Sequence, residues 1–474
     1  MSTMPKLAVI ATFFALSCAL VACETADTAK AIPAPCGGVD EACCVGVAPC
    51  STDLGCSANV CLSLPFADGN ACATATECAS SICGGDGICA VPSCTDTVVN
   101  GDESDVDCGG SCGPCALGQG CKATADCIRG SCFQDKCGFE PGGLLGKGGD
   151  SSTVAWTQIA GAGEGLWAPA DLAFNTDFPE QLWVVDRDHD ALLVIFTPDK
   201  VPTFRLLLDI SQHFLEEVLA ISFDGHGSFG TCGDSRNDYG GQAKPNDFMG
   251  PVQWPSNIDH YPKGASAHTQ HWDMLHSTPS CLGIIAAGAN QFFCVNGQIG
   301  SIDWYDFHLP HVPGGDDHSD GEKRRYLNPS MKIARVEGLP SNMVFDAATG
   351  NYYIADTGNG RIVRFSPDGA TKGKLIQSFG GDGKMHAMSD FAIEAIAAGE
   401  MTSPTGLALH EGTLYVGDNA SGIVHAYSLA GVHLRALDSG LGKGRLGGMT
   451  AGPDDRLYFA DITGKRVVRI DTTW

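Results

Sequence analysis

A pattern that recurs with variations through the last two-thirds of the chain constrains the architecture most. The clearest copies are NMVFDAATGNYYIADTGNGRIVRFSPDG (342–369), GLALHEGTLYVGDNASGIVHAYSLAG (406–431) and GGMTAGPDDRLYFADITGKRVVRID (447–471). Each copy contains an apolar run, a turn, a second run that ends in Asp, a Gly- or Asn-rich turn, and a third apolar run. A unit this short cannot cover both faces of its own sheet, so the copies must pack side by side.

Three more divergent copies, at 170–196, 217–239 and 281–307, bring the number of repeats to six. Short, evenly spaced strand runs separated by Gly, Asp and Asn turns predict an all-β fold with one sheet per repeat. The pattern resembles the NHL repeat family over most of 154–474. That resemblance implies a six-bladed β-propeller, preceded in this chain by small disulfide-rich modules.

The last repeat ends at RVVRIDTTW, one strand short of a four-stranded sheet. We expect TVAWTQIAG (153–161), just before the first repeat, to supply the missing outer strand. Pairing the two ends of the repeat region would close the ring and hide strand edges that otherwise aggregate.

An acidic or amide side chain ends the second run of most repeats. These residues are Asp186, Asn296, Asp356, Asp418 and Asp461. A ring of inward-facing acids would be a candidate metal channel. The interpretation that we favour is that each side chain accepts hydrogen bonds from its own tight turn, as Asp and Asn commonly do.

Cysteines dominate the region before the repeats. Eighteen of the 23 cysteines lie between Cys36 and Cys137, a density typical of exported, disulfide-stapled modules. Two segments share one spacing: Cys72, Cys78, Cys83 and Cys89, and Cys121, Cys127, Cys132 and Cys137. Four cysteines allow three pairings, so the connectivity stays open. We place the modules at 36–137, a linker at 138–153 and the propeller at 154–474.

An acidic stretch, NGDESDVDCGGSCGPC (100–115), separates these two modules. The carboxylates of Asp102, Glu103, Asp105 and Asp107 are hard ligands that suit calcium. No EF-hand spacing follows, however, so a solvated acidic turn between disulfides is the preferred interpretation.

The N-terminus has the features of an export signal. Lys6 precedes the apolar run 7–22, which is short for a membrane span. The run ends in Leu-Val-Ala-Cys at Cys23, which resembles the lipobox of bacterial lipoproteins and implies acylation of Cys23. Residues 1–22 are then the signal peptide and 23–35 a flexible tether. The alternative is ordinary cleavage near Ala19 or Ala22.

These features predict an outer-membrane or cell-surface lipoprotein that touches the membrane only through its lipid. The net charge of −26 argues against nucleic acid as a partner, because the phosphates would be repelled.

Function is expected where long loops interrupt the repeats, at 233–257, 260–280 and 306–326. Seven of the fourteen histidines lie in the last two stretches. The candidate metal ligands are His271, Asp273, His276, His308, His311, Asp317 and His318. Imidazoles and carboxylates in such numbers indicate zinc, copper or iron, with calcium less specific. The alternative is that they bond backbone groups of two ordered loops.

The position of the two loops poses a geometric problem. The first precedes the third repeat, whereas the second follows its third strand, so simple propeller geometry puts them on opposite faces. They can share a site only if the second loop climbs the side of the blade. Otherwise His271, Asp273 and His276 form the better candidate set.

Three functional hypotheses follow. The first is a binding protein for a protein, glycan or small-molecule ligand. The second is a metal-dependent lyase or hydrolase in which Arg324 or Arg325 steadies an anionic substrate. Peptidylglycine amidating lyase resembles this architecture and holds zinc through Pro-His pairs, but no Pro-His pair opens a repeat here. The third is a structural adhesion protein.

Three cysteines lie within the repeats: Cys232, Cys281 and Cys294. Exported proteins rarely leave thiols free, so we expect one disulfide among them. Cys281 and Cys294 flank a turn in two paired strands and are one candidate pair.

Overall fold

The structure is a computed structural model. It describes residues 36–44, 50–51, 54–210, 213–236, 249–311, 313–315, 317–376 and 382–472. The predicted signal peptide, the tether and Cys23 lie outside these residues. None of the helices in the described ranges has the length and hydropathy needed to span a bilayer.

The described fold is all-β, and its helical content consists of short 3-10 turns. Those turns are η1 (Ala75–Glu77), η2 (Thr124–Asp126), η3 (Gly143–Leu145), η4 (Ser151–Thr153), η5 (Ala162–Glu164), η6 (Ile258–His260), η7 (Ala267–Gln270) and η8 (Thr357–Asn359). The chain divides into two compact units, one ending at Asp107 and one beginning at Cys108.

Disulfides take the place of a large core in the cysteine-rich region. Its regular structure is limited to two hairpins, β1 (Leu54–Ser57) with β2 (Val60–Ser63) and β3 (Ser131–Phe133) with β4 (Lys136–Gly138). Disulfides of the first stretch are Cys36–Cys44, Cys43–Cys56 and Cys50–Cys61.

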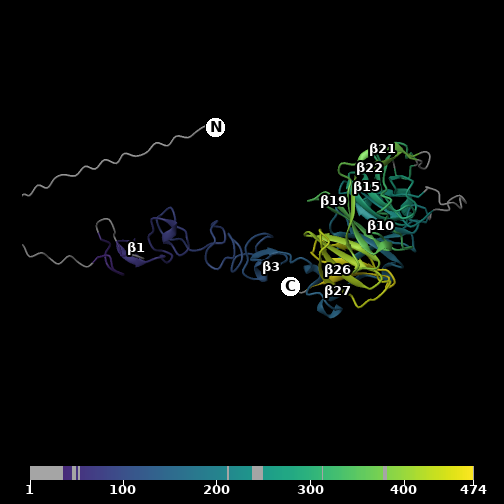
Figure 1. The fold of residues 1–474 in the computed structure, drawn as a ribbon. Coiled ribbons are helices and arrows are strands. Elements are labelled where there is room, and N and C mark those ends of the chain that lie inside the picture. The colour runs from purple at the N-terminus through teal and green to yellow at the C-terminus, as the bar shows by residue number, and fades with distance from the viewer. Residues whose placement is uncertain are drawn as a thin grey trace, which may run out of the picture. The chain divides into compact units, whose positions relative to one another are not determined.

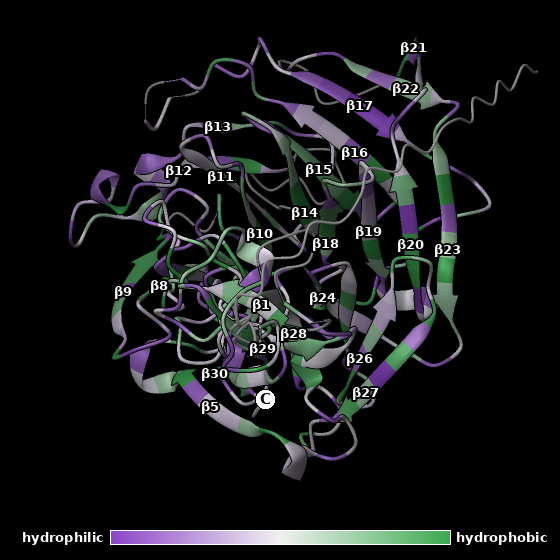
Figure 2. Cartoon of the chain, turned by 90° about the vertical axis from the view of Figure 1, so that its left-hand side faces the viewer, coloured by the Kyte–Doolittle hydropathy of each residue, from purple (hydrophilic) through white to green (hydrophobic). Residues whose placement is uncertain are grey.

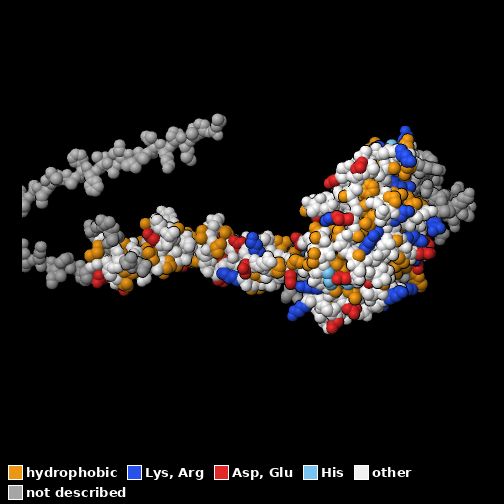
Figure 3. Space-filling view, in the orientation of Figure 1, with side chains coloured by type: hydrophobic (Ala, Val, Ile, Leu, Met, Phe, Trp, Pro, Cys, Tyr) orange, Lys and Arg blue, Asp and Glu red, His pale blue; other side chains and the backbone are white. Residues whose placement is uncertain are grey.

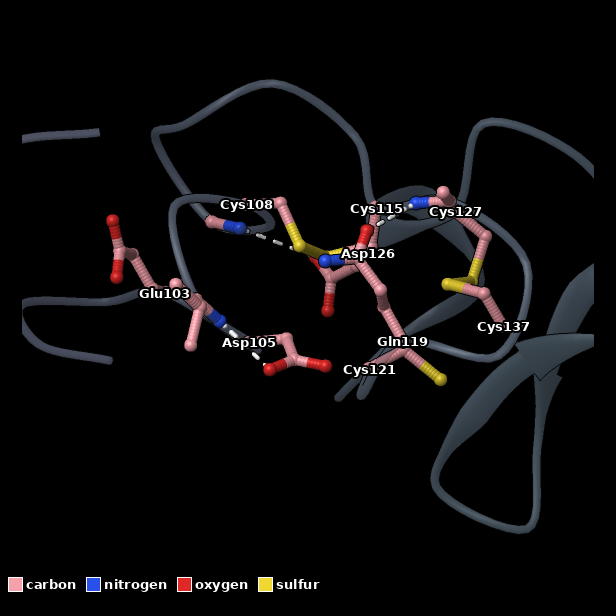
Figure 4. Close-up of a disulfide and its surroundings, with 12 residues drawn as sticks. Glu103, Asp105, Cys108, Cys115, Gln119, Cys121, Asp126, Cys127 and Cys137 are labelled. Atoms are coloured by element: carbon pink, nitrogen blue, oxygen red, sulfur yellow. Dashed lines mark hydrogen bonds between the residues drawn. A yellow bond between two sulfur atoms is a disulfide. The ribbon is translucent and has the colours of Figure 1, made fainter. Parts of the chain in front are cut away.

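The two four-cysteine segments are paired in the same way, first to third and second to fourth. The bonds are Cys72–Cys83 and Cys78–Cys89, and Cys121–Cys132 and Cys127–Cys137. This shared pairing shows that the equal spacing seen in the sequence reflects a duplicated module. In Figure 4, Cys127–Cys137 lies close to Cys108–Cys115, and the Cys115 N–H donates to the Asp126 carbonyl at 2.6 Å.

The carboxylates of the acidic stretch bond to backbone groups. Asp107 accepts a hydrogen bond from the Thr97 N–H at 3.0 Å, and Glu103 accepts one from the Asn100 N–H at 3.2 Å. These contacts are of the kind expected for a turn.

Six sheets form a six-bladed propeller, seen as a ring in Figure 2 and from the side in Figure 1. Blade 1 consists of β6 (Pro169–Phe174), β7 (Gln181–Asp186), β8 (Ala191–Phe196) and β9 (Thr203–Leu208), and blade 2 of β10 (Val218–Phe223), β11 (Ser228–Gly233), β12 (Val252–Pro255) and β13 (Asp273–Met274). Blade 3 consists of β14 (Cys281–Gly288), β15 (Gln291–Asn296), β16 (Ser301–Asp306) and β17 (Glu322–Tyr326), and blade 4 of β18 (Met343–Asp346), β19 (Asn351–Asp356), β20 (Arg361–Ser366) and β23 (Ala392–Ala398). Blade 5 consists of β24 (Pro404–His410), β25 (Thr413–Asp418), β26 (Ile423–Ser428) and β27 (His433–Asp438), and blade 6 of β28 (Leu446–Ala451), β29 (Leu457–Asp461), β30 (Arg466–Asp471) and β5 (Ala155–Ala160).

The burial of each strand follows from its place in its blade. Neighbouring blades cover both faces of the middle strands, so β7 is buried along its whole length and reads as a nearly continuous apolar run. The outermost strand β9 alternates, and most of its residues are exposed. On the face shown in Figure 3, acidic and basic side chains are scattered among hydrophobic ones.

The ring closes as the sequence predicts. Strand β5, which precedes the first blade, pairs antiparallel with β30 as the fourth strand of the last blade, with Trp156 opposite Ile470.

One blade is larger than its sequence repeat. The segment between β20 and β23 forms two further strands, β21 (Thr371–Leu375) and β22 (Met385–Ser389), which join blade 3. Strand β22 pairs parallel with β17, placing Arg324 opposite His386. An insertion within the fourth repeat therefore extends the outer edge of the third blade.

The recurrent Asp and Asn residues build turns, as predicted. The Asn296 side-chain oxygen accepts from Gln298 N–H at 3.1 Å. The Asp186 carboxylate accepts from the backbone of Trp167 and Ala168, the chain entering its blade.

Residues 138–153, predicted as a linker, pack against the propeller. Leu144 and Leu145 are buried in a cluster with residues of blades 5 and 6. The second four-cysteine module is fixed to the same blades, because Arg129 pairs with Asp455, whose other partner is His410.

The cysteines of the repeats form one disulfide, Cys232–Cys281, and Cys294 is a buried free thiol. The alternative pair, Cys281 with Cys294, is excluded by register, because Cys294 lies opposite Ile284 and Cys281 lies opposite Asn296. The disulfide therefore joins blades 2 and 3.

Candidate metal centre

The two histidine-rich loops meet because the second runs along the edge of blade 2. The His311 N–H donates to the Trp272 carbonyl at 3.1 Å, and the Gly314 N–H donates to the His271 carbonyl at 2.9 Å. The connection between β16 and β17 thus lies against the residues just before β13. It climbs the side of the blade, as a shared site requires.

Three predicted ligands converge there: Asp273, His311 and His318. One donor atom of each lies within 4.8 Å of the other two. Asp273 is fully buried, whereas the His318 side chain is 17% exposed, so the group lies at the rim of the protein and not in its core. Zinc, copper and iron sites combine such imidazole and carboxylate donors.

The Asp273 carboxylate is the best-defined member of the group. Its Oδ1 lies 2.7 Å from His318 Nδ1 and accepts from the Met274 N–H at 2.7 Å. Its Oδ2 is buried without a hydrogen-bond partner among the described residues. Burial raises the pKa of Asp273, and the hydrogen bond from His318 offsets part of that rise. A buried carboxylate oxygen that lacks a hydrogen-bond partner is a favourable ligand for a cation.

His271 lies beside the group, with its ring 5.2 Å from that of His311. Both of its nitrogens face carbonyl oxygens, of His268 at 2.6 Å and of Gly315 at 3.2 Å, and its ring stacks on Phe214. Burial lowers the pKa of His271 to about 4, so the ring is neutral at pH 7. Its contacts orient the two loops.

His276 lies on the other side, with its ring 6.0 Å from that of His318. Asp382 holds the ring through contacts of 2.9 and 3.0 Å to Nδ1 and accepts from the His276 N–H at 2.6 Å. Burial alone would raise the pKa of Asp382, but the hydrogen bond from His276 and the charge of Lys323 keep it below its usual value. When Nδ1–H donates to a carboxylate, Nε2 carries the lone pair of the neutral ring and can accept a proton or bind a metal.

The remaining predicted residues lie apart from this group. The exposed His308 ring is 3.5 Å from Asp306, at the end of β16. Asp317 is exposed and bonds to Ser319. Arg324 pairs with Glu322, and Arg325 pairs with Asp303.

Sequence reasoning missed two neighbours of the site. The first is His213, whose pKa is lowered to about 4, mainly by burial and to a smaller extent by the nearby charge of His276. Asp382 belongs to the insertion that carries β21 and β22. The only signal for Asp382 was the interruption of the fourth repeat, and His213 immediately precedes the second repeat with no pattern to mark it.

No family model and no curated protein matches the sequence. Solved structures share the propeller fold at low similarity. An auxiliary nutrient binding protein from Bacteroides thetaiotaomicron is 12% identical, with a TM-score of 0.43 over 71% of this chain and 78% of that one. A gluconolactonase from Xanthomonas campestris is 15% identical, with a TM-score of 0.39 over 70% of this chain and 93% of that one. Similarity at this level carries no information on function.

Proposed function

We propose that this protein is an exported, lipid-anchored, NHL-type propeller that binds its ligand with the help of a divalent metal ion held by Asp273, His311 and His318. The convergence of these three side chains from two separate loops carries the proposal. Zinc is the favoured ion, because two imidazoles and one carboxylate form a common zinc donor set.

The partly exposed rim position of His318 supports a binding role. Three protein donors leave a coordination position for an oxygen or nitrogen of a ligand. The ligand is a protein, glycan or small molecule that presents such a group. His271 and His276 orient the loops from either side, as supporting residues of metal sites do.

Elemental analysis of the purified full-length protein tests the site, after growth with zinc, copper, iron and calcium. We expect about one zinc per chain in the wild type and at least a tenfold loss of affinity in Asp273→Ala and His318→Ala. His308→Ala is the matched control, since its ring faces Asp306. A wild-type protein without bound metal overturns the proposal.

The lipid anchor needs its own test. Incorporation of a labelled fatty acid is expected in the wild type and absent in Cys23→Ala. Equal labelling, or none in either protein, rejects the lipobox interpretation while leaving the metal site open.

A metal-dependent hydrolase or lyase is the second candidate. The observation that favours it is His276, fixed by Asp382 next to His318 in the arrangement of a general base. Zinc-dependent cleavage of p-nitrophenyl acetate that falls in His276→Ala, with zinc still bound, would support catalysis. Zinc binding without such cleavage supports the binding role.

A further inference from the structure

The centre of the ring contains a cavity, and none of the residues lining it belongs to the proposed metal centre. All six inner strands contribute to its wall, and its volume is about 260 Å³. Figure 2 shows β10, β14, β18, β24 and β28 towards the middle of the ring, whereas β13 and β17 lie farther out. Leu172, Ile285 and Leu409 are among the lining residues, and polar groups share the cavity surface with apolar ones.

Adjacent blades lie close together where the inner strands begin. There, adjacent blades bond backbone to backbone, Ser341 N–H to the Leu282 carbonyl at 2.8 Å and Asn342 N–H to the Thr405 carbonyl at 3.1 Å. A Cβ at Gly283 would lie only 2.0 Å from the Ser341 carbonyl oxygen, so glycine is what permits this approach. Towards the strand ends the wall opens, and Phe345 is 39% exposed.

Polar groups lie at the narrow end of this cavity, which we call the central funnel. Asp171 and Asn342 are 3% and 5% exposed, respectively. Asp171 Oδ2 accepts from the Ile221 N–H at 3.1 Å, and Asn342 Oδ1 accepts from the Met449 N–H at 3.3 Å. Asp171 is the only ionisable side chain in the described lining, which contains no Lys, Arg or His.

The electrostatics of this narrow end favour a cation. A carboxyl group buried with amide donors but no basic residue resists ionisation, and burial raises the pKa of Asp171 to about 7. A cationic ligand at the carboxylate would supply the positive charge that the lining lacks. Small-molecule sites commonly combine apolar surface with a few polar groups, and the lining of this cavity contains both.

We infer that the central funnel binds a small organic cation, with its ammonium group at Asp171 and the rest of the molecule between the inner strands. The site is separate from the proposed metal centre and does not depend on it. A monocyclic aromatic amine has the required chemistry and fits the volume.

Titration calorimetry of the full-length protein with benzylamine, benzyl alcohol and benzoate tests this inference. At pH 8 benzylamine is expected to bind at least about tenfold more tightly than benzyl alcohol, because charge-assisted hydrogen bonds contribute about 1.5–3 kcal/mol. Benzoate is not expected to bind. The preference should disappear in Asp171→Asn and persist in Asp317→Asn, whose carboxylate lies on the surface.

A second variant guards against misfolding of Asp171→Asn. Ala451 lines the wall and is half-buried, so Ala451→Phe should block benzylamine and benzyl alcohol without touching the carboxyl group. Equal affinity for benzylamine and benzyl alcohol, or binding of benzylamine that survives both variants, overturns the inference. Chelation of metal should leave benzylamine binding unchanged, so this result and that of the metal test are separable.

Discussion

The His318 Nδ1 atom lies 2.7 Å from Asp273 Oδ1, a contact between side chains 45 positions apart. It joins the β16–β17 connection to the outer strand of blade 2. Asp273 of blade 2 and His318 of the connection within blade 3 thus contribute to one polar centre at the junction of these two blades.

The first prediction concerns stabilisation by metal. Because an ion that binds only the native state stabilises it by mass action, excess zinc should raise the Tm of the wild type by several degrees, reversibly on chelation. Asp273→Ala and His318→Ala should show no increase, and His308→Ala should respond as the wild type does. An equal shift in all four proteins would place zinc elsewhere.

A second prediction follows from the raised pKa of Asp171. Between about pH 4 and 7 the native state holds a proton that the unfolded chain has lost, so stability should fall as pH rises, by at most about 1.4 kcal/mol per pH unit. Asp171→Asn does not titrate, so its unfolding free energy should gain on the wild type between pH 5 and pH 8. Chemical denaturation at several pH values measures the difference. Parallel pH profiles would contradict it.

The docking of the second four-cysteine module depends on Asp455. Asp455→Ala removes the partner of both Arg129 and His410 and should destabilise the docked module by about 2 kcal/mol. Arg129→Ala should cost only about 1 kcal/mol, because the arginine is 47% exposed. Hydrogen exchange of residues 121–137 reports the effect. Lys136→Ala, at an exposed position of β4, serves as the control and should leave exchange unchanged.

The cysteines of the propeller should differ in reactivity. Burial raises the pKa of Cys294, so native protein should leave this thiol unmodified by iodoacetamide, whereas denaturation without reductant exposes it. Peptides with Cys232 and Cys281 should be modified only after reduction. Peptide mass spectrometry distinguishes the three, and a modified Cys281 in unreduced protein would refute the pairing.

The fold could be predicted from the sequence because the apolar runs and turns of each repeat mark the positions of its strands. Counting those strands also identified residues 153–161 as the closing strand, confirmed in β5. The insertion that carries Asp382 was not predictable in this way, because its strands pair with blade 3 while its sequence lies within repeat 4. Local periodicity contains no information on such a partner.

The site was predicted in part for a similar reason. Histidine density identified both loops, but their meeting depends on backbone bonds from His311 and Gly314 to the residues before β13. Hydrogen bonds between irregular segments leave no periodic trace. His308 lies in the same histidine-rich stretch as His311 and His318, but its ring faces Asp306 and not the metal centre.

The pairing of β5 with β30 has a consequence for biosynthesis. The final blade takes one strand from the beginning of the propeller and three from its end, so the ring stays open until translation has passed Asp471. The four-cysteine modules need no such delay, since their disulfides link residues only 10 or 11 positions apart. The four-cysteine modules can therefore form their disulfides independently of the ring, which is the last part of the chain to close.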